Sequence, residues 1–121
     1  MARIDSIMDL LDTGMRAEGL RQRSIAANVA NVETPGYLRQ DVQFEQFLAK
    51  ALESSDSLDL DDVEPQLYHP RETAVKANGN DVNLEQEVGE MVKNSIRQKT
   101  FMRLLSKKYR QIESAMDTGR A

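Results

Sequence analysis

Residues 83–117 read NLEQEVGEMVKNSIRQKTFMRLLSKKYRQIESAMD, and this stretch decides the expected fold. Its apolar residues recur at alternating spacings of four and three, which is the repeat of one face of a long helix. The apolar stripe comprises Leu84, Val88, Met91, Met102, Leu105, Tyr109, Ile112 and Met116, and the polar Ser95 and Gln98 interrupt it. Asn83 followed by Gln86 resembles a capping box at a helix N-terminus. The stretch therefore predicts one helix of roughly 50 Å.

The same spacing occurs near the N-terminus of the chain. The apolar positions there are Ile4, Met8, Leu11, Met15, Ile25, Val29 and Val32, and the polar Glu18 and Gln22 interrupt them. Thr13-Gly14 predicts a break or a flexible joint, because glycine weakens a helix interior. Pro35 predicts the end of the helix, since the residue before a proline avoids the helical region. The two segments together predict a mainly α fold, in which long terminal helices pair as a coiled-coil-like hairpin.

The chain between the two helices has an irregular composition. Pro35-Gly36 suits a type II turn, and residues 41–52 predict a short amphipathic helix. The apolar face of that helix is expected to comprise Phe44, Phe47, Leu48 and Leu52. Residues 72–77 predict a short strand that leads into a tight turn at Asn78-Gly79. The expected organisation is an N-terminal helical segment (1–35), an acidic and partly mobile connection (36–82) and a C-terminal helix (83–121).

Composition excludes several classes of function. The chain has 121 residues, no cysteine and one histidine, His69, so thiol catalysis, thiolate sites and His-pair metal sites are excluded. Asp59, Asp61 and Asp62 lack the glycine and glutamate spacing of a calcium-binding EF-hand loop. No catalytic, cofactor or metal site is predicted. No apolar run approaches the roughly 20 residues that span a bilayer, and the acidic residues near the N-terminus argue against a cleavable signal peptide.

Charge is distributed unevenly along the chain. Residues 41–65 hold eight acidic residues and one basic residue, whereas residues 92–121 hold eight basic and two acidic ones. The two regions either attract each other, within one chain or between chains, or are simply solvated. The cations of the last helix are expected to scatter around it, which disfavours a nucleic-acid interface. They are Arg97, Lys99, Arg103, Lys107, Lys108 and Arg110.

Each terminal helix carries more apolar surface than one partner helix covers. Leu10, Val92, Ile96 and Phe101 lie off the expected seam. Spare apolar surface on long helices predicts assembly with further subunits. The expected assembly interface comprises Ile4, Met8, Leu11, Met15, Ile25, Val29, Val88, Met91, Met102, Leu105, Tyr109 and Ile112.

Residues 27–37 read ANVANVETPGY and carry a specific motif. Six positions resemble the N-terminal signature of bacterial flagellar rod, hook and hook-associated axial proteins: Asn28, Asn31, Thr34, Pro35, Gly36 and Tyr37. The short length and the opening of the last helix make the chain most similar to the basal body rod proteins, and among these to the proximal component. Another small rod protein, FlgC, shares the motif and the architecture. The resemblance covers roughly residues 1–50 and 76–117.

The resemblance implies a structural role without catalysis and without a cofactor. Such proteins form the periplasmic drive shaft and export channel of the flagellum, and they reach it through the flagellar type III apparatus without a cleavable signal peptide. The implied partners are further copies of the chain, the rod proteins FlgC and FlgF, the adaptor FliE, the export gate and the MS ring. The alternative is a stand-alone helical adaptor that binds an acidic or nucleic-acid partner through its basic C-terminal helix.

The motif also has a physical interpretation. Asn28 and Asn31 lie about one helical turn apart, so their amides are expected to satisfy backbone groups at the helix end and in the Pro35-Gly36 turn. Tyr37 is expected to anchor the redirected chain in an apolar niche while its hydroxyl group stays paired.

Overall fold

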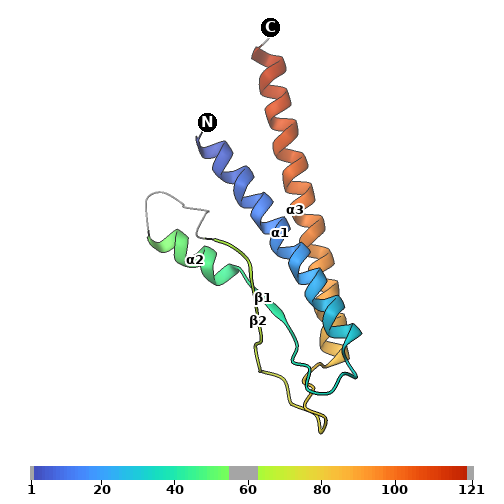
Figure 1. Cartoon of the computed structure of the whole chain (residues 1–121). Coiled ribbons are helices and arrows are strands. Elements are labelled where there is room, and N and C mark those ends of the chain that lie inside the picture. The colour runs from blue at the N-terminus through green and yellow to red at the C-terminus, as the bar shows by residue number, and fades with distance from the viewer. Residues whose placement is uncertain (1, 55–62, 120–121) are drawn as a thin grey trace.

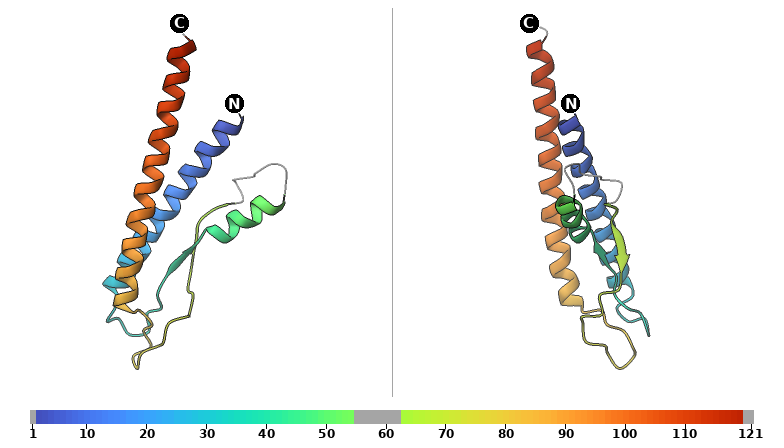
Figure 2. Two further views of the ribbon diagram at one scale, coloured as in Figure 1. Left: turned by 180° about the vertical axis from the view of Figure 1, so that it is seen from behind. Right: turned by 90° about the vertical axis from the view of Figure 1, so that its left-hand side faces the viewer.

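The terminal helices form an antiparallel hairpin, as the sequence predicts. The computed structural model describes residues 2–54 and 63–119. The elements in chain order are α1 (Ala2–Ala30), β1 (Asp41–Gln43), α2 (Glu45–Ser54), β2 (Gln66–Tyr68) and α3 (Leu84–Gly119) (Figure 1). Helix α1 lies between α3 and the chain that connects the two helices, residues 31–54 and 63–83, which we call the middle segment (Figure 1). Helices α1 and α3 diverge towards the chain termini (Figure 2).

Helix α1 runs without interruption through Thr13 and Gly14, so the predicted break there is wrong. Gly14 is buried against α3, because a Cβ atom at this position would lie 2.5 Å from the ring of Phe101. The hydroxyl group of Thr13 donates a hydrogen bond to the carbonyl oxygen of Asp9 at 2.8 Å, one turn earlier in the same helix. The glycine therefore permits close packing of the two helices, and this contact outweighs its low helix propensity.

This contact predicts opposite behaviour of two glycines in the same helix. A Cβ atom at Gly19 meets no other heavy atom within 4 Å. Gly19→Ala is therefore expected to raise the free energy of unfolding by up to about 1 kcal/mol through helix propensity alone. Gly14→Ala is expected to gain less or to lose stability, because the Phe101 ring must move. Urea denaturation of both variants measures the difference, and an equal gain would contradict the close contact.

Helix α1 ends at Ala30, five residues before the predicted stop at Pro35. Residues 31–36 form turns, and the amide N–H of Asn31 donates to the carbonyl oxygens of Ala27 and Asn28 at 3.1 and 3.2 Å. Helix α3 begins as predicted, because the Oδ1 atom of Asn83 accepts the backbone N–H of Gln86 at 3.1 Å. It then continues through Gly89 to Gly119.

The middle segment differs from the expectation in two places. Residues 41–43 are a strand, and α2 begins only at Glu45 instead of Asp41. β1 pairs antiparallel with β2, with Val42 opposite Leu67, whereas residues 72–77 do not form the predicted strand. Pairing with a partner strand decides these assignments, because alternation over so few residues does not separate strand from helix. The tight turn at Asn78-Gly79 is confirmed, with Gly79 at a φ of 86°.

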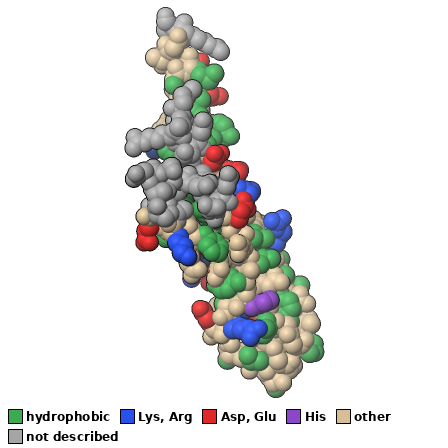
Figure 3. All heavy atoms as spheres, turned by 60° about the vertical axis from the view of Figure 1, so that its left-hand side comes forward, with side chains coloured by type: hydrophobic (Ala, Val, Ile, Leu, Met, Phe, Trp, Pro, Cys, Tyr) green, Lys and Arg blue, Asp and Glu red, His purple; other side chains and the backbone are tan. Residues whose placement is uncertain are grey.

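A small apolar core joins the middle segment to α1. Ala17, Phe44 and Val63 are buried together, and Phe47 and Leu48 pack against them. The side chains of Ile4 and Leu52, and the acidic residues Asp59, Asp61 and Asp62, lie outside the described residues. Within the described ranges, no helix is long and apolar enough to cross a membrane. Figure 3 shows hydrophobic side chains spread among charged ones over the face that it presents.

Candidate functional site

The turn after α1 is built by the motif residues themselves. The Nδ2 atom of Asn31 donates to the carbonyl oxygen of Ala27 at 2.8 Å, and the Thr34 hydroxyl group donates to the Oδ1 atom of Asn31 at 3.0 Å. Gly36 has a φ of 74°, and the N–H of Tyr37 donates to the carbonyl oxygen of Thr34 at 3.3 Å. A positive φ before the closing residue is what a type II turn requires, so the predicted turn is confirmed.

Asn80, near the end of the middle segment, holds this turn in place through hydrogen bonds. Its Nδ2 atom donates to the carbonyl oxygens of Asn31 and Thr34, both at 2.8 Å. Its Oδ1 atom accepts the N–H of Val82 at 2.7 Å. One buried amide therefore fixes the distance between the turn after α1 and the chain that enters α3.

Asn28 is fully buried and uses its entire hydrogen-bonding capacity. Its Nδ2 atom donates to the carbonyl oxygen of Gln40 at 2.9 Å and to the Oε2 atom of Glu87 at 3.1 Å. Its Oδ1 atom accepts the Gln40 N–H at 2.8 Å and the Tyr37 hydroxyl group at 3.0 Å. An amide offers two donor hydrogens and two acceptor lone pairs, and all four are satisfied. Asn28 therefore joins α1, the chain after the turn and α3.

An ion pair completes this network. Glu87 is 0% exposed, and its Oε1 atom accepts the Nε hydrogen of Arg39 at 2.7 Å. The buried Arg39 also donates its backbone N–H to Asp81 at 2.6 Å and lies 3.5 Å from Asp41. Burial disfavours the charged guanidinium, but its hydrogen bond to Glu87 and the nearby carboxylates outweigh this effect and raise the pKa of Arg39. Arg39 therefore keeps its positive charge although it is buried.

Tyr37 lies in this polar network. Its hydroxyl group is paired with Asn28, as predicted, but the charged Glu87, Arg39 and Asp81 lie near enough to influence it, so its surroundings are not an apolar niche. Burial and the charge of Glu87 raise the pKa of Tyr37. The phenol therefore stays neutral, in the form that donates to Asn28.

A second buried network lies halfway along the hairpin, at the polar break of both stripes. The buried Glu18 accepts hydrogen bonds from Arg21 at 2.6 Å and from the Nδ2 atom of Asn94 at 3.0 Å. Asn94 also donates to the backbone carbonyl oxygen of Glu18 at 2.8 Å. Next to them, Gln98 donates to the Oε1 atom of Gln22 at 3.0 Å. The two polar interruptions therefore meet, and they set the alignment of the helices.

Arg21 connects this second network to α2. It pairs with Glu18 on its own helix and with Glu45 at the start of α2. Burial acts to raise the pKa of Glu45, but the hydrogen bond and the charge of Arg21 outweigh it, so this pKa is lowered. Because the Glu45 side chain is 61% exposed, solvent screens the pair, and its role is to orient α2 more than to stabilise the chain.

The residues predicted to form the assembly interface fall into two groups, apart from Ile4, whose side chain lies outside the described residues. Leu11 and Ile25 are buried, and partly buried positions accompany them: Met8, Met15, Val29, Leu105 and Ile112. The other four residues keep 48–60% of their surface exposed, and they are Val88, Met91, Met102 and Tyr109. Only part of the apolar stripe of α3 therefore lies in the seam of the hairpin. The side facing α1 also presents Glu87, Asn94 and Phe101.

Sequence reasoning missed the polar partners of the motif. The charged residues Arg39, Asp81 and Glu87 are not singled out by pattern, because a charged residue normally indicates a solvated surface, and the sequence gives no role to Asn80. One signal was available: Glu87, Asn94 and Phe101 follow each other at intervals of seven, which places them on one face of α3.

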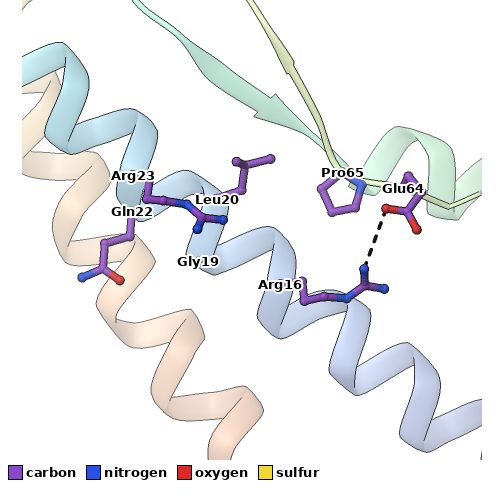
Figure 4. Close-up of a pocket in the computed structure, with 7 residues that line it drawn as sticks. All are labelled: Arg16, Gly19, Leu20, Gln22, Arg23, Glu64 and Pro65. Atoms are coloured by element: carbon purple, nitrogen blue, oxygen red, sulfur yellow. Dashed lines mark ion pairs between the residues drawn. The ribbon is translucent and has the colours of Figure 1, made fainter.

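A surface hollow of about 470 Å³ lies beside the middle of α1. Its lining includes Arg16, Gly19, Arg23, Glu64 and Pro65, and the Arg16 guanidinium group lies 3.8 Å from Glu64 (Figure 4). The lining offers a single carboxylate and no nucleophile. No group of three or more acidic or histidine residues in the described ranges is placed to hold a metal ion.

Comparison with known proteins identifies the family. No model of a protein family matches the chain. The flagellar basal body rod protein FlgB of Bacillus subtilis (strain 168) is 20% identical over 129 residues, which cover 99% of the chain and 100% of that protein. The FlgB protein of Borreliella burgdorferi is 30% identical over 95 residues, which cover 64% of the chain and 70% of that protein. A FlgB protein from Salmonella typhimurium is 34% identical over 50 residues, 41% of the chain and 36% of that protein. The chain belongs to the family of flagellar basal body rod proteins FlgB.

Proposed function

We propose that this chain is a structural subunit of the proximal rod of the bacterial flagellum and that it assembles through its terminal helices. The single observation that carries the proposal is the exposed apolar face of α3. Val88, Met91, Met102 and Tyr109 share that face, and each remains about half exposed. Exposed apolar side chains that gather on one face mark an interaction site.

The buried networks support the same role. They fix the turn after α1 against the start of α3, so the two helices emerge from one end in a defined arrangement. A fixed hairpin can present its outer faces repeatedly to identical neighbours, which a helical assembly requires. In this role the chain performs no catalysis and needs no cofactor.

The family membership supports the finer parts of the proposal. We place the subunit in the periplasmic drive shaft and export channel, reached through the flagellar type III apparatus. Its partners are then further copies of itself, the rod proteins FlgC and FlgF, the adaptor FliE, the export gate and the MS ring. The terminal segments 1–35 and 83–121 form the inner rod domain, and residues 36–82 connect them.

Met102→Glu tests the proposal in the source cell. The new carboxylate is tolerated in the free chain, because Met102 is 56% exposed, but it must be desolvated when a neighbour covers the face. We expect export to continue, incorporation into basal bodies to fall at least about tenfold and motility to be lost. Quantitative immunoblots of purified basal bodies and of the culture medium measure the two effects.

Ala49→Glu is the matched control, because it adds the same charge at an exposed position of α2, away from this face. It is expected to leave both measurements unchanged. Normal incorporation of the Met102→Glu chain would refute the proposed interface, and a wild-type chain absent from basal bodies would refute the proposed function.

A further inference from the structure

A hydrogen bond between the two helices marks one open flank of the hairpin. Gln98 of α3 donates to the Oε1 atom of Gln22 of α1 at 3.0 Å, and this contact is exposed. The middle segment packs elsewhere on α1, because Ala17 is buried against Phe44 and Val63. Ala17 lies about 140° around the helix from Gln22, so the middle segment leaves the flank with Gln22 and Gln98 uncovered.

Apolar side chains line this flank on both helices. Met91 and Met102 share it with Gln98, since residues three, four or seven apart lie on one side of a helix, and both stay about half exposed. Met15 and Val29 lie seven residues to either side of Gln22 on α1. We call this flank the open face, and it comprises Met15, Gln22, Ala26, Val29, Leu84, Val88, Met91, Ser95, Gln98, Met102, Leu105 and Tyr109.

The open face favours a partner that resembles it. None of its residues is charged, so a charged partner would lose hydration without meeting an opposite charge. An apolar and uncharged face on the partner has no such cost. A second copy of the chain presents that face, and two identical faces that meet are related by a two-fold axis.

Two antiparallel α3 helices match layer by layer across such an axis. With the axis beside residues 96 and 97, Ser95 lies opposite Gln98 of the second copy, so the polar break of the stripe meets itself. Met91 then lies opposite Met102 of the second copy. The outer layers pair Val88 with Leu105 and Leu84 with Tyr109. Every polar position thus meets a polar one, and every apolar position meets an apolar one.

We propose that two copies of the free chain pair through their open faces, with the α3 helices antiparallel, and form a four-helix bundle. The pairing covers the apolar stripe of α3 over about 38 Å, from Leu84 to Tyr109. A two-fold contact is closed, so the dimer does not grow into a filament. It covers the face that the proposed rod contact uses, and it must therefore open before a subunit is incorporated.

Light scattering during gel filtration tests the association of the purified chain. We expect a mass twice the 13.7 kDa of one chain at high protein concentration, and a fall towards the single-chain mass on dilution. Met102→Glu is expected to weaken the dimer at least about tenfold, because the new carboxylate loses its hydration in the contact. Ala49→Glu, at an exposed position of α2 away from the open face, is the matched control and is expected to dimerise as the wild type does.

A pair of opposite charges tests the register. Met91→Lys alone is expected to weaken the dimer as Met102→Glu does. One chain that carries both substitutions places a cation opposite a carboxylate in two layers of the dimer, so its association is expected to recover at least about tenfold relative to either single variant. The two positions lie about 16 Å apart along their own helix, so they do not pair within one chain. Circular dichroism checks that each variant keeps its helices.

Disulfide formation tests the same layer without charges. The chain has no cysteine, so an introduced thiol is unique. A tagged Met91→Cys chain is mixed with a differently tagged Met102→Cys chain and oxidised, and we expect a disulfide that joins the two tags. Each variant alone is the control, because its own two thiols are about 16 Å apart along the dimer, beyond the reach of a disulfide.

The outcomes separate the dimer, its register and the rod function. A single-chain mass at every concentration, or association that Met102→Glu leaves unchanged, overturns the dimer. A dimer without the mixed disulfide, or without recovery in the double variant, overturns the antiparallel pairing of α3. The rod function is measured independently, by the presence of the wild-type chain in basal bodies.

Discussion

Glu87→Leu is expected to lower the free energy of unfolding by about 3–5 kcal/mol, because it leaves Arg39 charged and buried without its main partner. The two groups are joined by a hydrogen bond of 2.7 Å, and Glu87 is fully buried. The substitution also removes the acceptor of one Asn28 hydrogen bond. Urea denaturation followed by far-ultraviolet circular dichroism measures the change.

Glu85→Leu is the matched control, since Glu85 is exposed in the first turn of the same helix. Its effect is expected to stay within about 0.5 kcal/mol. The double variant Arg39→Met with Glu87→Leu removes both charges and is expected to recover part of the loss. An equal loss in Glu87→Leu and Glu85→Leu would show that the ion pair does not hold the start of α3.

Asn28→Asp is expected to lower the free energy of unfolding by about 3 kcal/mol or more, although it replaces only the side-chain NH2 group by an oxygen. The new carboxylate cannot donate to the Gln40 carbonyl oxygen. It also stands beside the Glu87 carboxylate, because in the unsubstituted chain the Oε2 atom of Glu87 lies 3.1 Å from the Nδ2 atom of Asn28. Two buried like charges repel each other, and a backbone acceptor is left without its donor. The same denaturation experiment measures the effect.

Asn31→Asp separates the role of the network from the general cost of changing a motif asparagine. Asn31 is only partly buried, and its Nδ2 atom makes one hydrogen bond, to the Ala27 carbonyl oxygen. Its substitution is expected to cost about 1 kcal/mol. Asn28 contacts Glu87, so the losses of stability caused by Asn28→Asp and by Glu87→Leu are not expected to add in the chain that carries both substitutions. Equal effects of the two aspartate substitutions would contradict a special role of Asn28.

The motif shows how far short-range reasoning reaches. Asn31 bonds a carbonyl oxygen at the end of α1, and Gly36 takes the positive φ of the predicted turn. Both features depend only on residues a few positions apart along the chain, so spacing and turn chemistry were sufficient to predict them. The partners of Asn28 are different, because Glu87 is 59 residues away in sequence. No local pattern specifies such a pairing.

The two helices show the same division. The sequence by itself determined that both ends are long helices and that Asn83 begins α3, since periodicity and caps act within a few turns. Only the tertiary structure decided which face of α3 meets α1. The alternating apolar spacing favoured the stripe with Val88 and Met102, yet the buried side holds Glu87, Asn94 and Phe101.

The physical reason is that burial depends on available partners and not on hydrophobicity alone. Glu87 and Asn94 become inexpensive to bury once Arg39, Asn28 and Glu18 satisfy them, and those partners come from other segments of the chain. Gly14 likewise becomes a packing site only when Phe101 lies against it. Local propensity thus set the elements of this protein, whereas long-range pairing of polar groups set their faces and left Val88, Met91, Met102 and Tyr109 of the apolar stripe exposed.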